Sequence, residues 1–176
     1  MDASSTYQDS LPITSDALLA MLDEWGLTYR LHTHAPLRTV EDSKSIEDEI
    51  LVPGENALRI KNLYLRDRKK RNYLVTLEQD RDIDLKALGA DLGVGSLSFG
   101  SPDRLMEHLG IRPGAVSPLA MITGATKNVT FYMDACAKQA DLINMHPLVN
   151  DRTVVMKMTD VMQLMERLNV SVMWLP

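Results

Sequence analysis

Two polar residues, Lys61 and Asn62, interrupt an apolar run that has the pattern of a strand. The alternation of a strand divides this run into two faces, with Leu58, Ile60, Asn62 and Tyr64 on one and Arg59, Lys61, Leu63 and Leu65 on the other. An ammonium group withdrawn from water is costly unless it meets an anion, and a substrate phosphate is one such anion. On the strand alone, a lysine that reaches solvent or pairs with a carboxylate of its own chain is the simpler interpretation.

A histidine and a short loop supply two further candidates for chemistry. His146 precedes Pro147 at the end of an expected strand, where the chain must leave the sheet in an extended conformation on a rigid support. The loop from Gly114 to Pro118 can hold backbone N–H groups outwards, an arrangement that suits a carbonyl or an oxyanion. Each has an ordinary alternative, namely a histidine bonded to a backbone carbonyl and a simple turn.

Other patterns are weaker. His32 and His34 share one face of an expected strand and could serve a metal site, but no third ligand lies nearby, so we expect neither a metal nor a cofactor. The glycine-rich segment from Gly93 to Gly100 fails as a dinucleotide fingerprint because Ser98 occupies the sixth position. It also fails as a nucleophile elbow because Ser96 replaces the first glycine.

Charge is distributed unevenly along the chain. The segment from Arg59 to Arg71 holds seven basic residues and one acid, so its charge of +6 leaves −11 for the remainder of a chain whose total is −5. A net negative chain is not expected to bind DNA through its general field, yet a local basic segment can contact a polyanion such as RNA. The basic residues of the expected hairpin tip are Arg66, Arg68, Lys69, Lys70 and Arg71. A solvated tip is the alternative.

Composition limits the class of protein. A chain of 176 residues with 45% hydrophobic content is long enough for one domain with a sizeable core. The single cysteine, Cys136, excludes an internal disulfide. We see neither an apolar stretch of about 18 residues nor a signal-peptide pattern, so we expect a cytoplasmic protein with no membrane partner.

The predicted elements give a mixed α/β (α+β) fold, with one central mixed β-sheet flanked by helices. Residues 1–12 are polar and predicted to be flexible, and residues 13–176 are predicted to form one domain. Helices are predicted at about 14–26, 39–50, 84–88, 101–110, 134–141 and 159–168. Strands are predicted at 28–32, 57–65, 73–77, 119–123, 129–133, 142–145, 153–158 and 170–175.

Four segments in this order resemble the YbaK/ProX-type prolyl-tRNA editing family, within it the freestanding branch called PrdX or ProXp-ala. They are Lys61–Asp67, Leu92–Pro102, Leu109–Pro118 and Asn144–Asn150. The resemblance covers nearly the whole chain and implies the fold of an aminoacyl-tRNA editing domain. Because no signature of a synthetase body is present, it implies an enzyme that acts in trans. The implied reaction is hydrolysis of the ester between a wrong amino acid, foremost alanine, and the 3′ end of proline tRNA.

The resemblance also implies roles for individual residues. Lys61 would contact the terminal adenosine and its phosphate. The aminoacyl carbonyl would be bound by backbone N–H groups of the loop formed by Gly114, Ala115, Val116, Ser117 and Pro118. Asn62, Met145 and His146 would line the substrate site. Water would be oriented by the ribose hydroxyl of the substrate, because an aminoacyl ester is already activated and positioning with oxyanion stabilisation can suffice.

Size supplies the reason for editing. A synthetase pocket built for proline cannot strongly reject alanine, since a few missing methylenes are worth only about 1–3 kcal/mol. A second, smaller pocket excludes proline by steric clash. We expect this pocket to be apolar and to include residues near Thr39, Val40 and Leu63.

Two alternatives stay open from the sequence. One is a deacylase for another mischarged residue, such as cysteine or serine, and the other is a non-catalytic tRNA-binding module. The sequence also leaves open a transient association with prolyl-tRNA synthetase. The enzyme interpretation predicts that Lys61, His146 and the loop from Gly114 to Pro118 converge on one pocket.

Overall fold

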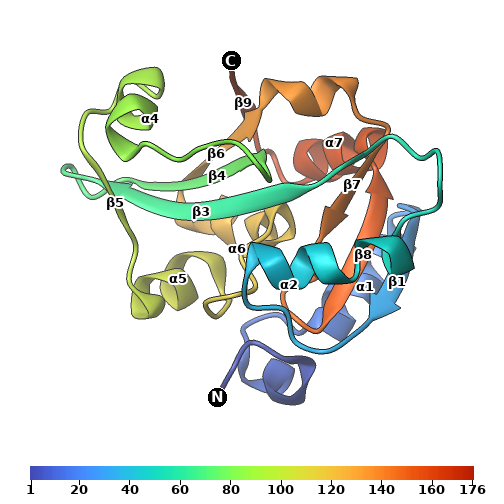
Figure 1. The fold of residues 1–176 in the computed structure, drawn as a ribbon. Coiled ribbons are helices and arrows are strands. Elements are labelled where there is room, and N and C mark those ends of the chain that lie inside the picture. The colour runs from blue at the N-terminus through green and yellow to red at the C-terminus, as the bar shows by residue number, and fades with distance from the viewer.

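Two β-sheets form the frame of the molecule, as the computed structural model of residues 1–176 shows (Figure 1). The four-stranded sheet has the order β1 (Tyr29–Thr33), β8 (Arg152–Lys157), β7 (Leu142–Met145) and β2 (Ala57–Leu58). The five-stranded sheet has the order β5 (Leu97–Phe99), β3 (Ile60–Asp67), β4 (Asn72–Glu78), β6 (Val129–Asp134) and β9 (Val172–Leu175). Each contains parallel and antiparallel pairs. The predicted mixed α/β class is confirmed, whereas the single central sheet is wrong because the strands divide between two sheets.

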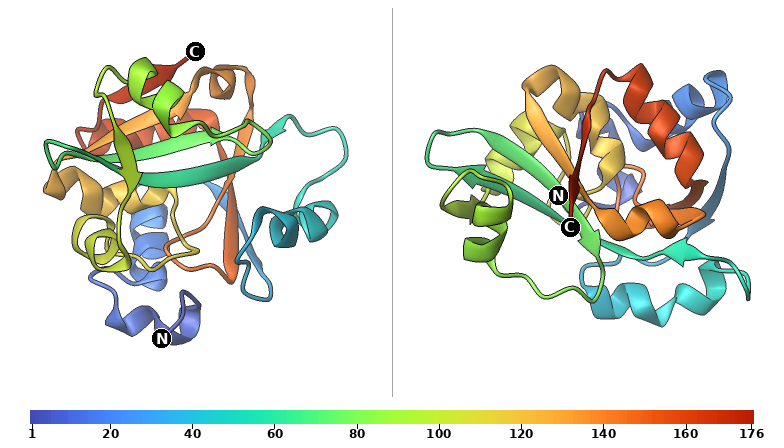
Figure 2. Two further views of the ribbon diagram at one scale, coloured as in Figure 1. Left: turned by 60° about the vertical axis from the view of Figure 1, so that its left-hand side comes forward. Right: turned by 90° about the horizontal axis from the view of Figure 1, so that it is seen from above.

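Helices cover the outer faces of both sheets (Figure 2). The α-helices are α1 (Ser15–Glu24), α2 (Val40–Ser45), α3 (Glu47–Ile50), α4 (Leu85–Asp91), α5 (Pro102–Leu109), α6 (Met121–Gly124) and α7 (Met158–Arg167). The 3₁₀ helices are η1 (Ser5–Ser10), η2 (Pro118–Ala120), η3 (Ala125–Lys127) and η4 (Ala135–Gln139). None of these helices is long and apolar enough to cross a membrane.

One stretch of chain belongs to both sheets. β2 pairs in parallel with β7, and after the single residue Arg59 the chain continues as β3, which pairs with β4. The predicted hairpin of β3 and β4 is therefore confirmed. Because side chains alternate along β3, Tyr64 packs into the larger hydrophobic cluster, while Leu63 and Leu65 pack into the smaller one. Both faces of this strand are buried, as its apolar pattern predicts.

The hydrophobic core has two parts. The larger cluster of 29 buried residues lies between the sheets and helices α1, α5, α6 and α7. The smaller cluster of 8 buried residues fills the space between the five-stranded sheet and α4. The sheets are thus held together by the larger cluster, and α4 shields the remaining face of the hairpin.

Local sequence signals explain most helix ends. The Thr14 side chain accepts a bond from Ala17 N, and Thr39 and Asp42 form the reciprocal bonds of a capping box at the start of α2. Ser101 caps α5, which ends at Gly110 with a φ of 65°. These predicted boundaries are confirmed.

One predicted strand and one predicted helix cap are wrong. The strand predicted at 119–123 is instead η2 followed by α6, because Pro118 opens a helical turn and the Ser117 side chain accepts a bond from Leu119 N. A short apolar run fits a buried helix as well as a strand. Thr159 does not cap the last helix, which begins one residue earlier, after Lys157.

The N-terminal residues, predicted to be flexible, pack against the folded domain. Ser5 donates two bonds to the Asp151 carboxylate, from its N at 2.9 Å and its Oγ at 2.7 Å. The Ala3 carbonyl accepts a bond from Asn150 N at 2.9 Å, and Ala3 itself is buried. Polar residues that suggest a tail thus find partners on the loop that follows β7.

The replacement Gly89→Ala tests the packing of α4. An added Cβ would lie 1.9 Å from the Gly95 carbonyl oxygen, which belongs to the backbone and cannot rotate away. We expect the change to lower the free energy of unfolding by about 1–3 kcal/mol, although the same change in an open helix raises it by about 1 kcal/mol. Urea denaturation measures the difference. The control is Ala87→Gly at an exposed position of the same helix, and an unchanged or increased stability of Gly89→Ala would contradict the close approach.

Candidate functional site

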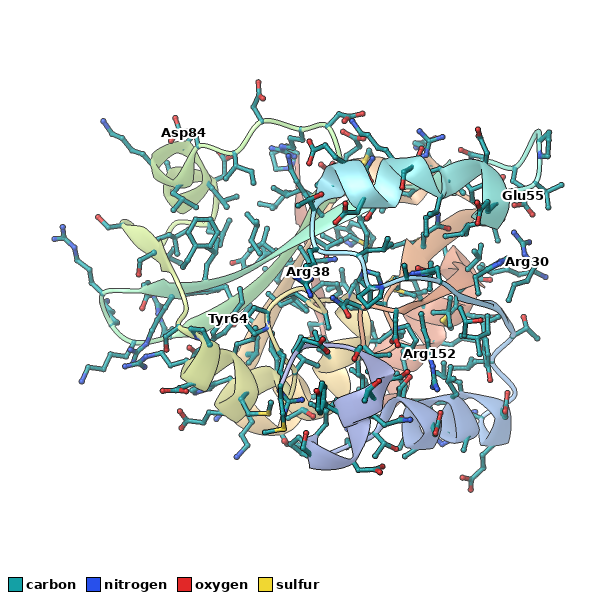
Figure 3. The ribbon with its side chains drawn as sticks, turned by 60° about the horizontal axis from the view of Figure 1, so that its bottom comes forward. Arg30, Arg38, Glu55, Tyr64, Asp84 and Arg152 are labelled. Atoms are coloured by element: carbon teal, nitrogen blue, oxygen red, sulfur yellow. The ribbon has the colours of Figure 1, made fainter.

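A cavity opens where the two sheets separate, beside α2 and α3. It has two adjoining chambers that share Leu37, Ser43, Ile60, Asn62 and His146. The outer chamber, about 270 Å³, is completed by Arg38, Thr39, Val40, Lys61, Gly114 and Val116. The inner chamber, about 70 Å³, is completed by Glu47, Ile50, Arg59, Gln79, Asn144, Met145 and Thr153. Arg38 marks the outer chamber in Figure 3.

The residues singled out in the sequence are largely gathered here. Seven of them line the outer chamber, namely Thr39, Val40, Lys61, Asn62, Gly114, Val116 and His146. Met145 lines the inner chamber. Lys61, His146 and two residues of the loop from Gly114 to Pro118 therefore meet at one cavity, which is the convergence that the enzyme interpretation predicts.

The Lys61 ammonium is held by the backbone. It donates a hydrogen bond to the carbonyl oxygen of Arg81, whose guanidinium in turn lies 3.0 Å from a carboxylate oxygen of Asp134. Burial raises the pKa of Asp134, but hydrogen bonds from Cys136 and Arg81 outweigh this effect and leave its pKa below the usual value. Asp134 is thus an anion that fixes the segment presenting the carbonyl. Lys61 neither pairs with a carboxylate nor needs one, and two of its three N–H groups stay available.

Asn62 is oriented by its cross-strand neighbour. Thr76 lies opposite it in the β3–β4 register, and its hydroxyl donates to Asn62 Oδ1 at 2.6 Å. This bond uses the acceptor end of the amide. The NH₂ end therefore remains to donate to a group in the cavity.

The loop after α5 depends on glycine. Gly114 has a φ of 96°, and a Cβ there would lie 3.3 Å from Asn150 Nδ2, so both backbone conformation and space favour glycine. The N–H groups of Gly114 and Val116 make no hydrogen bond within the chain. The N–H of Ala115 donates instead to the Arg112 carbonyl at 3.1 Å. Two of the three predicted carbonyl-binding N–H groups are therefore free.

Three residues of the loop are placed behind the cavity. Ala115, Ser117 and Pro118 are buried and line neither chamber. Ser117 caps η2, and Pro118 is its first residue. These residues shape the loop, so the predicted direct contacts of Ala115, Ser117 and Pro118 with substrate are not supported by their position.

His146 is held as a neutral hydrogen-bond acceptor. Its Nδ1 lies 2.8 Å from the Arg152 carbonyl oxygen, which can only accept, so the proton resides on Nδ1 and the lone pair on Nε2. Burial lowers the pKa of His146, and the His34 ring, 6.3 Å away between centroids, lowers it further. The bond to Arg152 acts in the opposite direction but does not restore the ordinary value.

Leu63 does not belong to the cavity, contrary to the expectation that it walls the amino-acid pocket. It is buried in the smaller cluster that α4 covers, and it lines neither chamber. Leu37 and Ile60 provide apolar surface in its place. The inner chamber is polar, since Glu47, Gln79, Asn144 and Thr153 line it, and sequence reasoning missed all four.

These missed residues differ in how visible they are in the sequence. Asn144 lies two residues before His146 on an expected strand, so alternation alone places the two on one face. Glu47 comes from a separate segment and bonds Gln79 at 3.1 Å. Nothing local in the sequence brings those two together.

The basic hairpin tip contains cations of two kinds. Arg71 is engaged with the buried carboxylate of Asp67, with 2.6 Å between Nη2 and Oδ2. Tyr73 donates to the same carboxylate, and burial together with this bond raises the pKa of Tyr73 to about 12. Arg68, Lys69 and Lys70 are exposed. Only these three project freely, because Arg71 serves the turn and Arg66 is half-buried.

No group of three or more His, Cys, Asp or Glu residues is arranged to hold a metal ion. Both ring nitrogens of His34 are occupied, Nδ1 by the Ala35 carbonyl and Nε2 by the Thr153 hydroxyl, each at 2.8 Å. His34 therefore has no free ring nitrogen for a metal ion, and its hydrogen bonds support the fold.

Comparisons with known proteins identify the family of the chain. The sequence profile of the family described as "Aminoacyl-tRNA editing domain" matches residues 34–164. The chain is 37% identical over 145 residues to a protein from Acetoanaerobium sticklandii named "Prolyl-tRNA editing protein ProX", covering 82% of this chain and 85% of that one. It is also 37% identical over 99 residues to the mouse protein named "Prolyl-tRNA synthetase associated domain-containing protein 1", covering 53% of this chain and 58% of that one.

A solved structure shares the fold. The crystal structure of a candidate trans-editing enzyme for prolyl-tRNA synthetase superposes with a TM-score of 0.66 at 16% identity, covering 92% of this chain and 95% of that one. The matched profile spans far more than half of the chain, and the resemblance predicted from four motifs is confirmed. The chain belongs to the aminoacyl-tRNA editing domain family.

Proposed function

We propose that this protein hydrolyses the ester of misacylated proline tRNA in trans, and that alanine is the amino acid it removes. As a member of the editing-domain family, the chain is an aminoacyl-tRNA deacylase. The observation that carries the finer proposal is the convergence of Lys61, Asn62, His146 and the free N–H groups of Gly114 and Val116 on one cavity.

The reaction needs only positioning in this site. Lys61 offers two free N–H donors and a positive charge to the phosphate of the terminal nucleotide, and its bond to Arg81 fixes the direction of approach. The N–H groups of Gly114 and Val116 suit the ester carbonyl, whose oxygen gains negative charge as water attacks. The cavity lining contains no serine, cysteine or histidine arranged as a nucleophile with a partnered base. Water oriented by the substrate's ribose hydroxyl is consistent with that set of groups.

The size of the cavity favours a small amino acid. The inner chamber, about 70 Å³, is much smaller than the outer chamber of about 270 Å³. A small inner chamber suits a methyl group or an amino group better than a larger side chain. Its polar lining also keeps serine and cysteine as alternatives, because Asn144 and Thr153 could bond a hydroxyl or a thiol.

The first test charges proline tRNA with alanine, serine, cysteine or proline and follows release of each amino acid. We expect alanine to be released fastest and proline to be retained. Lys61→Ala should lower kcat/KM for alanine about 10- to 150-fold, the range expected for loss of a hydrogen bond to a charged group. Lys86→Ala, at an exposed site on α4, is the matched control. Retention of alanine by the wild type would refute the proposed substrate.

A second test concerns the basic tip. If Arg68, Lys69 and Lys70 contact tRNA phosphates, replacing all three with alanine should make the dependence of kcat/KM on salt concentration shallower, because fewer counterions are released. Hydrolysis of an alanyl ester of a short oligonucleotide that ends in the same 3′ nucleotide should not change. Equal salt slopes for wild type and variant on full-length tRNA would show that the tip is merely solvated.

The neutral state of His146 predicts how stability depends on pH. The folded pKa lies below the unfolded value of 6.5, so the unfolded chain holds more protons as pH falls through that value. Stability from this group is therefore complete above pH 6.5 and declines as pH falls toward the folded pKa. Urea denaturation between about pH 8 and pH 5 should show a smaller decline for His146→Gln than for the wild type. Identical declines would contradict the assignment of a lowered pKa to His146. Because His32, whose pKa is also lowered, is present in both proteins, it contributes equally to both curves.

A further inference from the structure

Asn144 carries an acceptor atom that nothing in the protein satisfies. Its Oδ1 is buried and has no hydrogen-bond partner, and its NH₂ group bonds no other residue. A buried, unpaired acceptor destabilises a folded protein, so native structures seldom contain one without a role. The side chain belongs to the wall of the inner chamber.

His146 presents a second acceptor to the same chamber. Asn144 and His146 are two residues apart at the end of β7, so they project from one face of the four-stranded sheet, and both line the inner chamber. The Nδ1 proton of His146 is committed to the Arg152 carbonyl, which leaves Nε2 with only a lone pair. The chamber thus offers two acceptors from adjacent positions of one strand.

The remaining charge of the chamber also favours a donor. Glu47 supplies a carboxylate that is paired with Arg59 at 3.2 Å and bonded by Gln79 at 3.1 Å, so this acid and base offset each other. Thr153 directs its hydroxyl to His34 Nε2, because the Nδ1 of His34 donates to the Ala35 carbonyl. Asn144 Oδ1 is then the buried polar atom of this lining that has no partner, while the NH₂ groups of Asn62 and Asn144 are free donors beside it. A ligand group that satisfies Asn144 Oδ1 and His146 Nε2 together must donate hydrogen bonds, and a positive charge strengthens them.

We propose that Asn144 Oδ1, together with His146 Nε2, binds the α-ammonium group of the aminoacyl ester. This inference rests on the proposed function, since an aminoacyl ester is the ligand that brings such a group. The ammonium is the one cationic, multiple-donor group close to the scissile ester. The site consequently selects esters that carry a free amino group and disfavours esters in which that group is absent. Asn144 is then a specificity residue that touches substrate.

The experiment compares two esters of proline tRNA that differ only in this group. One is alanyl-tRNA, and the other is lactyl-tRNA, in which a hydroxyl replaces the amine. Because the two esters differ in intrinsic reactivity, each variant is judged by the change in its alanyl-to-lactyl ratio of kcat/KM relative to the wild type. Asn144→Leu removes the acceptor at similar size. We expect it to lower kcat/KM for alanyl-tRNA by about 10-fold or more and to change the lactyl value little, which reduces the ratio about 10-fold.

Asn144→Asp is the second variant. It keeps an acceptor at the same place and adds negative charge, so the alanyl-to-lactyl ratio should equal or exceed that of the wild type. This outcome does not depend on whether Asn144→Leu folds, and a ratio well below the wild-type value would overturn the proposal. Gln163→Leu, at an exposed amide side chain on α7 outside the cavity, is the control and should leave both rates unchanged.

Equal losses on both esters for Asn144→Leu would assign Asn144 a structural role and overturn the inference while leaving the proposed function intact. Wild-type protein that releases neither acid from tRNA would instead refute the proposed function. The same comparison can be made with seryl-tRNA and the ester of its hydroxy-acid analogue. A lower amino-to-hydroxy ratio of kcat/KM for both the serine pair and the alanine pair would support recognition of the amine. Loss confined to seryl-tRNA would point to side-chain recognition and overturn it.

Discussion

The site depends on one constraint, which is that a single run of chain serves as a strand in both sheets. β2 is the edge of the four-stranded sheet and β3 is internal to the five-stranded sheet, with only Arg59 between them. Because this run of chain passes from one sheet to the other, the two sheets diverge on either side of Arg59. Ile60, Lys61 and Asn62 follow directly after that point. The cavity is therefore a result of topology, and Lys61 and Asn62 line it at the start of β3, before the buried stretch that begins at Leu63.

The groups around the cavity are prepared by the backbone more than by other side chains. Lys61 is anchored on a carbonyl, His146 donates to a carbonyl, and the loop at Gly114 offers N–H groups. The Arg152 carbonyl belongs to β8, and backbone groups such as these change little when one side chain is replaced. Such an arrangement supplies charge and hydrogen bonds without reorganisation, which is the main source of catalysis when the substrate bond is already activated.

Much of this could be predicted from the sequence, for reasons that differ between elements. The β3–β4 hairpin and the helix caps at Thr14, Thr39 and Ser101 follow from local rules of alternation and capping, so they are found correctly. The division into two sheets depends on which strands pair, and no local pattern states that β2 joins β7.

The cavity residues divide in the same way. Motif resemblance located Lys61 and His146, whereas Glu47 and Gln79 meet only through tertiary structure. The expectation that Leu63 walls the pocket is not supported, because Leu63 is buried in the smaller cluster.

The single thiol of the chain, Cys136, has low reactivity. Burial, followed by the hydrogen bond and charge of Asp134, raises the pKa of Cys136 to about 11, so very little thiolate exists near neutral pH. Since the thiolate is the form that oxidants and alkylating reagents attack, the carboxylate that steadies the Lys61 anchor also lowers the reactivity of the Cys136 thiol.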